Sequence, residues 1–285
     1  MVDKSLYPFK SNFFSPNGLN QMNYVDVGTG VPMVMVHGNP TWSFFYRNLA
    51  LLFKKKYRII IPDHMGMGLS DKPKKYQFTI KNHMENFGKL IDSLELPPFH
   101  LVVHDWGGPI GLSYAVSHPE KIKSLTILNT AAFNSKEIPF RIALCKFPLL
   151  GRIIIQGFNG FAYPATLMAS HKGLSREVKK GFLHPYKKLT SRAAQWKFVQ
   201  EIPLKPNHPN FNLIDSIEKK LHLLKCKKLI LWGEKDFCFN QSFLKRWREI
   251  YPEANVISYQ NAGHYLLEDA IWQIFPEMEN FLEKS

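Results

Sequence analysis

The stretch 101-LVVHDWGGPIGLSYA-115 decides the fold class of this 285-residue chain. Its first residues form an apolar run typical of a buried strand, and its last residues have helical spacing. Gly107 and Gly108 stand where a sharp strand-to-helix turn brings backbones close together. Asp105 occupies the tip of this turn, where such folds present a nucleophile. Because Val103 replaces the first glycine of the usual G-x-S-x-G pattern, Asp105 alone could equally be a helix cap.

Runs rich in Val and Ile alternate along the chain with segments of helical spacing. This pattern predicts an α/β fold, a mostly parallel sheet flanked by helices. The expected strands are Met33–Val36, Tyr57–Ile61, His100–Val103, Leu125–Leu128 and Leu229–Trp232. The expected helices are Phe44–Phe53, Ile80–Leu94, Pro109–Ser117, Gln241–Ile250 and Trp272–Leu282. The segment Gln21–Val27 alternates between apolar and polar residues, which predicts part of an antiparallel edge of the sheet.

About a hundred residues separate the strands at 125–128 and 229–232, far more than a strand-to-strand crossover needs. We therefore expect an inserted helical cap at 133–218, between a first part of the core at 1–132 and a second part at 219–285. The insert is rich in large apolar side chains, which either fill a small core of its own or cover a pocket. They include Phe140, Phe147, Phe158, Phe161, Tyr163, Met168, Phe182, Trp196 and Phe198.

Two further turns carry the partners that a nucleophilic carboxylate needs, a base and an acid that orients it. Asp236 follows the predicted strand at 229–232, and His264 follows the apolar run Val256–Tyr259. Both turns lie at carboxyl ends of strands, where open α/β sheets place their sites. Asp105, Asp236 and His264, in this chain order, are therefore the predicted catalytic residues. Glu234, two residues before Asp236, is the alternative acid.

The loop 36-VHGNPTW-42 follows another predicted strand. Its backbone beside Asn39 and the amide of Trp106 predict an anion-stabilising pair. The side chains of both residues also carry N–H donors that can point at a leaving anion. The flanking residues His37 and His104 are interpreted as packing and loop-locking residues.

Composition excludes several classes of protein. Cys145, Cys226 and Cys238 have no C-x-x-C spacing, which indicates neither a disulfide framework nor a zinc site. Residues 1–16 lack the apolar run of a secretory signal, so we expect a reducing, cytoplasmic setting. The uncharged stretch Ile153–Ser170 is too polar for a transmembrane helix. No metal and no organic cofactor is expected, because neither ligand spacing nor a glycine-rich phosphate loop occurs.

The formal charge of +14 comes from lysines spread along the chain. Solvated faces explain most of such an excess, and no nucleic-acid motif accompanies it. An attraction to acidic partner proteins, or peripheral contact with an anionic membrane, stays open.

The motifs together resemble the haloalkane dehalogenase branch of the α/β-hydrolases over nearly the whole chain. The matching segments are HGNPTWSFFYRNL at 37–49, PDHMGMGLSDKP at 62–73, VVHDWGGPIGLSYA at 102–115, WGEKDF at 232–237 and AGHYLLEDA at 262–270. The resemblance implies an α/β-hydrolase fold with a cap and an Asp–His–Asp triad. Epoxide hydrolases share the Asp nucleophile and add two cap tyrosines, for which Tyr163 and Tyr186 are candidates.

Within this branch the chain is similar to the β-lactone decarboxylases of bacterial long-chain olefin biosynthesis. The similarity rests on LNTAAF at 128–133, FVQEIPLKPNHP at 198–209 and WGEKDFCFNQSFL at 232–244. It implies conversion of a cis-dialkyl β-lactone into a cis-olefin and carbon dioxide, an apolar substrate, and a complex with other olefin-biosynthesis enzymes. Haloalkane hydrolysis through an Asp105 alkyl ester is the runner-up, and a catalytically silent scaffold of the olefin-synthesis assembly is a third possibility.

Overall fold

The computed structural model describes residues 2–285, and an eight-stranded sheet forms its centre. The strand order is β1-β2-β4-β3-β5-β6-β7-β8. The pairings β1–β2 and β2–β4 are antiparallel, and those from β4 through to β8 are parallel. The strands are β1 (Asn12–Phe14), β2 (Met22–Val27), β3 (Val31–Val36), β4 (Tyr57–Pro62), β5 (Phe99–Asp105), β6 (Ile122–Thr130), β7 (Lys227–Gly233) and β8 (Asn255–Tyr259).

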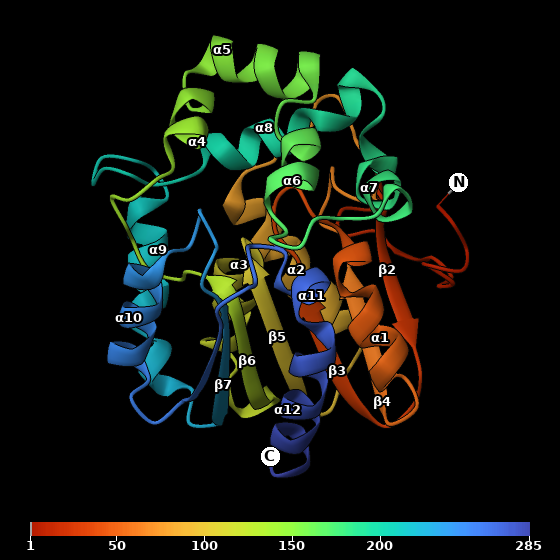
Figure 1. Cartoon of the computed structure of the whole chain (residues 1–285), viewed down its shortest axis with the longest axis vertical. Helices are drawn as coiled ribbons and strands as arrows, with labels where there is room; N and C mark the ends of the chain where they lie inside the picture. Colours follow the sequence, from red (N-terminus) through yellow and green to blue (C-terminus); the bar gives the residue numbers. More distant parts are fainter. Residues whose placement is uncertain (1) are drawn as a thin grey trace.

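Helices cover both faces of this sheet. On one face, α12 (Ile271–Glu283) packs against α1 (Arg47–Phe53) and α11 (Leu266–Asp269), in front of the sheet in Figure 1. A second group consists of α2 (Ile80–Ser93), α3 (Gly107–Ala115) and α9 (Phe211–Glu218), in which α3 packs against the other two. Between β7 and β8 runs α10 (Gln241–Ile250).

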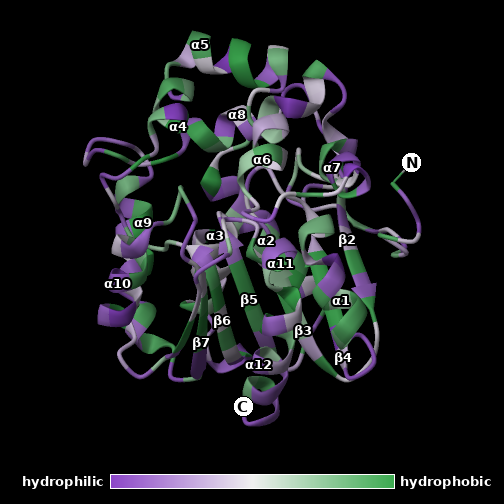
Figure 2. Ribbon diagram, viewed as in Figure 1, coloured by the Kyte–Doolittle hydropathy of each residue, from purple (hydrophilic) through white to green (hydrophobic). Residues whose placement is uncertain are grey.

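The central strands of the sheet are almost completely buried from solvent. Every residue of β5 is buried, and its neighbour β6 is buried except at Lys123. Figure 2 shows these central strands as hydrophobic and the outer helices as mixed. Strands covered by helices on both faces need apolar side chains in both directions, which is why their sequences are continuous rather than alternating. The buried centre holds the ends of β5 and β7 rigidly, and both ends lead into the candidate site.

The chain between β6 and β7 is helical, and most of it lies above the carboxyl ends of the strands (Figure 1). Its helices are α4 (Phe140–Cys145), α5 (Pro148–Arg152), a π-helical turn (Ile153–Gly157), α6 (Ala162–Met168), α7 (Arg176–Leu183) and α8 (Ala193–Gln200). The predicted limits 133 and 218 of a separate cap stay a prediction, and α9, inside them, packs against α3. None of the helices within residues 2–285 has both the length and the apolar character needed to cross a lipid bilayer.

The predicted strands and helices are present in the structure, with differences at their ends. The segment expected to be one helix from Phe44 begins as a 3-10 turn, Ser43–Tyr46, before α1. The short edge strand β1 was not predicted, because three residues are too few to show a period. The segment 21–27, expected to be part of an antiparallel edge, is β2, which pairs antiparallel with the edge strand β1 and with β4.

One expectation about the insert is wrong for part of its aromatic residues. Phe182 and Phe198 are buried, but Phe140, Phe147, Phe158 and Tyr163 are exposed. These four side chains neither fill a small core nor cover the pocket. The reason is geometric, because short helices such as α4 and α5 contact the rest of the protein with one face and leave the other uncovered.

Candidate active site

The site begins at the turn between β5 and α3. Asp105 has a φ of +50°, in the left-handed region that side chains other than glycine rarely adopt. A Cβ on Gly107 would lie 1.9 Å from the carbonyl oxygen of Val36, and one on Gly108 would lie 2.0 Å from Oγ1 of Thr130. Only glycine fits at either position, so the two glycines of the sequence motif allow the close approach of strand, turn and helix.

The carboxylate of Asp105 is held by one oxygen and free at the other. The backbone N–H of Asn39 donates to Oδ1 of Asp105 over 2.7 Å, and the N–H of Trp106 also donates to this carboxylate. Oδ2 lies 3.6 Å from Nε2 of His264. The amide of Asn39, which belongs to the anion-stabilising pair that the sequence predicted, thus holds Oδ1 of the carboxylate itself, while Oδ2 faces His264.

Asp236 holds His264 from the other side. Nδ1 of His264 is 2.8 Å from Oδ2 of Asp236, and the other oxygen of Asp236 accepts from the backbone N–H groups of Cys238 (2.6 Å) and Phe239 (3.1 Å). Asp236 is buried, whereas Glu234 is exposed. The structure therefore brings together Asp105, His264 and Asp236, and it leaves the alternative acid Glu234 outside.

Burial and neighbouring charges shift the pKa values of Asp105 and His264. Burial raises the pKa of Asp105, an effect that nearby His264 and the two backbone donors only partly offset. Burial by itself would lower the pKa of His264, but the carboxylates of Asp236 and Asp105 outweigh it and raise that pKa above its usual value. An imidazolium between two carboxylates is therefore the favoured charge state.

The two flanking histidines have structural contacts. Nδ1 of His37 lies 2.8 Å from the carbonyl oxygen of Gly38, and its Nε2 accepts from the backbone N–H of His64 at 3.1 Å. Burial lowers the pKa of His37 to about 3, so this ring stays neutral. His104 contacts the carbonyl oxygen of His264 through Nε2, at 2.9 Å. Both histidines lock loops, as the sequence indicated.

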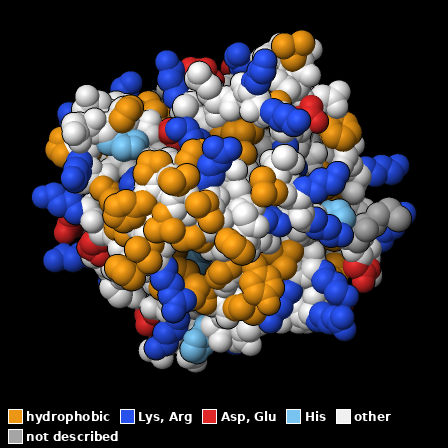
Figure 3. All heavy atoms as spheres, turned by 90° about the horizontal axis from the view of Figure 1, so that it is seen from above, with side chains coloured by type: hydrophobic (Ala, Val, Ile, Leu, Met, Phe, Trp, Pro, Cys, Tyr) orange, Lys and Arg blue, Asp and Glu red, His pale blue; other side chains and the backbone are white. Residues whose placement is uncertain are grey.

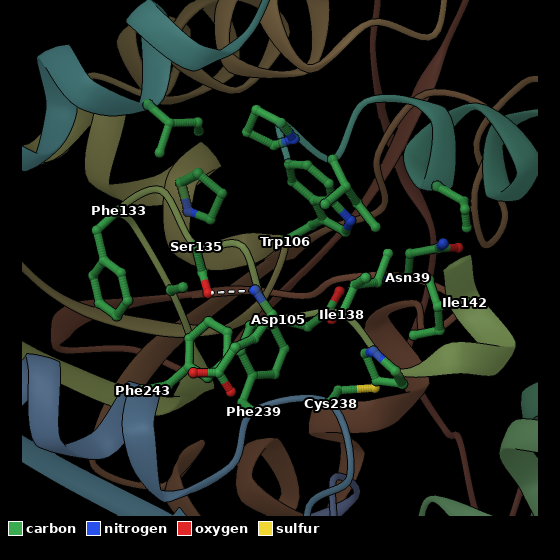
Figure 4. Close-up of a pocket in the computed structure, with 18 of the residues that line it drawn as sticks. Asn39, Asp105, Trp106, Phe133, Ser135, Ile138, Ile142, Cys238, Phe239 and Phe243 are labelled. Atoms are coloured by element: carbon green, nitrogen blue, oxygen red, sulfur yellow. Dashed lines mark hydrogen bonds between the residues drawn. The ribbon is translucent and has the colours of Figure 1, made fainter. Parts of the chain in front are cut away.

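A cavity opens above Asp105, and Figure 4 shows Asn39, Asp105 and Trp106 together on its wall. The side-chain amide of Asn39 donates to the carbonyl oxygen of Gln195 at 3.2 Å, which fixes the position of this residue between core and cap. The rest of the wall is mainly apolar, and the sequence did not predict it: Pro109, Ala131, Phe133, Ser135, Glu137, Ile138, Pro139, Ile142, Phe161, Val199, Ile202, Pro203, Ile214, Cys238, Phe239 and Phe243.

The two tyrosines that an epoxide hydrolase would require do not line this cavity. Tyr163 is exposed on α6. Tyr186 is buried away from the cavity, where its hydroxyl accepts from the N–H of Gly68 and donates to the carbonyl oxygen of Thr41, both at 3.3 Å. Neither tyrosine is placed to protonate a substrate above Asp105, so the epoxide-hydrolase alternative lacks the two acids that it requires.

Two buried polar residues that the sequence left unassigned hold the loops of the site. Asp269 accepts from the N–H groups of Gly263, His171 and Lys172 at 2.8 to 2.9 Å, and so ties the loop after α6 to the loop of His264. Asn129, at the end of β6, exchanges two hydrogen bonds with the backbone of Gly233. Lone polar residues at the ends of a strand and a helix give no sequence signal of such long-range contacts.

Asp236, Cys238 and His264 offer donor atoms within 4.8 Å of one another. Burial raises the pKa of the Cys238 thiol well above its usual value, which keeps it protonated and a poor ligand. The donor atoms of Asp236 and His264 also engage each other. This cluster is therefore part of the acid–histidine pair and does not fit a cation.

Known proteins resemble this chain in sequence and in fold. Residues 31–159 match the model of the alpha/beta hydrolase fold family. A cis-3-alkyl-4-alkyloxetan-2-one decarboxylase from Shewanella oneidensis is 42% identical over 100% of this chain and 92% of its own length. One from Xanthomonas campestris is 35% identical over 93% of both chains. The crystal structure of a haloalkane dehalogenase from Agrobacterium tumefaciens superimposes with a TM-score of 0.89 over 99% of both chains, at 22% identity.

Proposed function

We propose, from the premise that this chain belongs to the cis-3-alkyl-4-alkyloxetan-2-one decarboxylase family of α/β-hydrolase-fold enzymes, that it converts a cis-dialkyl β-lactone into a cis-olefin and carbon dioxide. The observation that carries this proposal is a buried carboxylate beneath a mainly apolar cavity. Asp105 is held at Oδ1 by a backbone N–H and keeps Oδ2 free beside His264. Alkyl chains gain about 0.8 kcal/mol per buried CH₂ in such surroundings.

In the first step Oδ2 of Asp105 attacks the β-carbon of the lactone. A bond forms between this oxygen and the carbon, and the bond from the carbon to the ring oxygen breaks with inversion. The ring opens to an alkyl ester that carries a free carboxylate. The side-chain N–H groups of Asn39 and Trp106 are the donors that we assign to this carboxylate, because both residues line the cavity beside Asp105.

In the second step the freed carboxylate leaves as carbon dioxide. Its carbon–carbon electrons form the double bond, and the bond from the β-carbon to Asp105 breaks, so that Asp105 leaves again as a carboxylate. Inversion followed by anti elimination keeps the cis geometry. We assign to His264, held by Asp236, the role of stabilising Asp105 when it becomes an anion again. No water and no external cofactor takes part in this route.

Oxygen-18 water distinguishes this route from hydrolysis. We expect Asp105 to stay unlabelled after many turnovers in labelled water, measured by mass spectrometry of the peptide that contains it. Label in its carboxylate would overturn the proposed route, since it would show that an ester of Asp105 is hydrolysed.

Haloalkane hydrolysis is the second candidate, because the same residues suit it. A halide would leave beside Asn39 and Trp106, and water activated by His264 would then cleave the Asp105 ester. The test is to give purified protein a cis-dialkyl β-lactone and, separately, a panel of bromoalkanes. We expect olefin, measured by gas chromatography, above an enzyme-free control and little bromide. Bromide and alcohol without olefin would reverse the assignment.

The third possibility, a silent scaffold, requires that Asp105 be dispensable. We expect Asp105→Ala to lose olefin formation while its circular dichroism stays that of the native protein. A folded Asp105→Ala protein that supports full olefin production would establish the scaffold instead.

A further inference from the structure

The helices farthest from the sheet expose a set of large apolar side chains, which we call the cap outer face. It spans α4, α5 and the π-helical turn and consists of Phe140, Phe147, Leu149, Leu150, Ile153 and Phe158. Phe158 is 80% exposed and Leu149 is 74% exposed. Seen from above the cap, Figure 3 shows a continuous apolar patch with lysine and arginine side chains beside it. Contiguous exposed apolar surface of this kind marks an interaction site.

The chain segment that carries this face has charges of one sign. No Asp or Glu occurs between Glu137 and Glu177, a stretch that contains the whole cap outer face. Arg141 and Arg152 are exposed within it. The guanidinium of Arg141 donates to Sδ of Met168 at 3.8 Å, and that of Arg152 donates to Oε1 of Gln156 at 3.4 Å. Within residues 2–285, neither guanidinium is neutralised by a carboxylate.

We propose that the cap outer face docks onto an anionic lipid bilayer, with its aromatic and aliphatic tips among the acyl chains and Arg141 and Arg152 at the lipid phosphates. A segment that combines apolar tips with basic residues and contains no acid has the pattern of helices that lie in a membrane interface. Anionic lipids attract the basic residues of such a surface. A protein partner is the competing occupant, and the experiment below separates the two.

The cap outer face lies close to the cavity, and this position indicates how docking would serve the reaction. This argument rests on the proposed function. α4 presents Phe140 to the outside, and Ile142, two residues later on the same helix, lies in the cavity wall. Ile138 and Pro139, directly before α4, also line the cavity. The docking face and the cavity wall therefore share α4, and docking would bring the cavity close to a substrate with two alkyl chains that is dissolved in the bilayer.

Vesicle binding by the full chain tests the proposal. The vesicles are equimolar phosphatidylglycerol and phosphatidylcholine, with pure phosphatidylcholine vesicles for comparison, and bound protein is measured by co-sedimentation at physiological salt. We expect binding to the anionic vesicles at least tenfold stronger than to the neutral ones. The triple variant Phe147→Ser, Leu149→Ser, Phe158→Ser should bind the anionic vesicles at least tenfold more weakly than the native protein.

A matched control variant removes apolar side chains from other faces. Phe13, Leu19 and Trp272 are 54%, 85% and 77% exposed and lie outside the insert. The triple variant Phe13→Ser, Leu19→Ser, Trp272→Ser should bind as the native protein does. Equal binding by native protein and cap variant would overturn the proposal, as would equal loss in the cap and control variants.

Two further outcomes separate the alternatives. In one outcome, the native protein does not bind anionic vesicles but forms a dimer in analytical ultracentrifugation, and the cap variant does not form this dimer. This outcome would make the face a protein interface and refute membrane docking. Turnover of a short-chain β-lactone in solution should be the same for native protein and cap variant. If no lactone is turned over while vesicle binding follows the expected pattern, the proposed function fails and the docking surface stands.

Discussion

Asp105 combines three features that a purely structural carboxylate would not need. It lies at a positive φ, it is buried, and one of its oxygens accepts a backbone hydrogen bond while the other faces His264. Unfavourable backbone geometry and buried charge both cost stability, and such costs are concentrated at functional sites. A helix cap gains nothing from them, so the geometry favours the nucleophile over the cap.

The raised pKa of Asp105 predicts that its ionised form, which the proposed reaction needs, lowers the stability of the folded protein. A carboxyl group whose pKa is raised in the folded state contributes stability below its unfolded pKa, and that contribution is lost as the pH rises through the folded pKa. At pH 7 the ionised group therefore costs stability. Asp105→Asn removes the charge but keeps an acceptor for the N–H of Asn39. We expect its melting temperature at pH 7 to rise by a few degrees, at roughly 2–4 °C per kcal/mol.

The same variant should lose olefin formation by at least about a thousandfold, because an amide is a poor nucleophile. The gain in melting temperature should shrink as the pH falls, because Asp105 of the native protein then becomes protonated and neutral as well. A melting temperature at pH 7 equal to or below that of the native protein would contradict a destabilising charge at this position.

The raised pKa of His264 predicts how kcat/KM depends on pH. Its raised pKa means that the imidazolium persists above the ordinary histidine range. In the proposed route this cation stabilises the departing carboxylate of Asp105, so kcat/KM for the lactone should fall as the pH rises through the pKa of His264. Hydrolysis of a haloalkane requires the neutral imidazole and should show the opposite slope.

The His264→Gln variant is the control for this profile. It should be slower than the native protein and should lack the alkaline decline. An unchanged alkaline decline in His264→Gln would assign that slope to a different group.

At the scale of elements, the turn from β5 to α3 depends on its glycines. Gly107→Ala would place a Cβ 1.9 Å from the carbonyl oxygen of Val36, and that backbone atom belongs to a central strand and has no room to shift. We expect about 1–3 kcal/mol lower free energy of unfolding, measured with urea, and a strong loss of activity, since Asp105 moves with the turn.

Gly157 provides the matched control for this substitution. A Cβ there would have nothing within 4 Å, and its φ lies outside the left-handed region. Gly157→Ala should therefore change the free energy of unfolding by no more than about 0.5 kcal/mol and leave activity intact. If both variants behave alike, the steric argument for Gly107 is wrong.

For the molecule as a whole, the decisive feature is that core and insert build the cavity together. Asp105, Trp106 and Phe243 come from the core, whereas Ile142 and Val199 come from helices of the insert. Ile142→Trp should narrow the apolar part of the cavity while leaving Asp105 and His264 in place. We expect KM for long-chain lactones to rise at least fivefold, with little change for short-chain lactones.

Leu149→Trp provides the control for this experiment. Leu149 is exposed on the neighbouring helix α5 and does not line the cavity. Assayed in solution without vesicles, this variant should match the native protein for both lengths of substrate. A uniform loss with Ile142→Trp, independent of chain length, would show damage to the site rather than a change of selectivity.

The sequence by itself determined the sheet, the order of the triad and the loops that carry it. Continuous apolar strands and paired glycines are local patterns, and local patterns predict local structure. Asp236 was the predicted acid and Glu234 the alternative, because two acids in one turn look alike, and the fold buries Asp236 against His264 while it leaves Glu234 exposed.

Only the tertiary structure decided what depends on contacts between distant segments. It brought Asp269 to the loops of both His264 and the insert, placed Tyr163 and Tyr186 outside the cavity, and left Phe140 and Phe158 on the surface. Whether an aromatic residue on a short helix is buried depends on what packs against that helix. Packing joins residues that are far apart in the chain, so no pattern of neighbouring residues can reveal it.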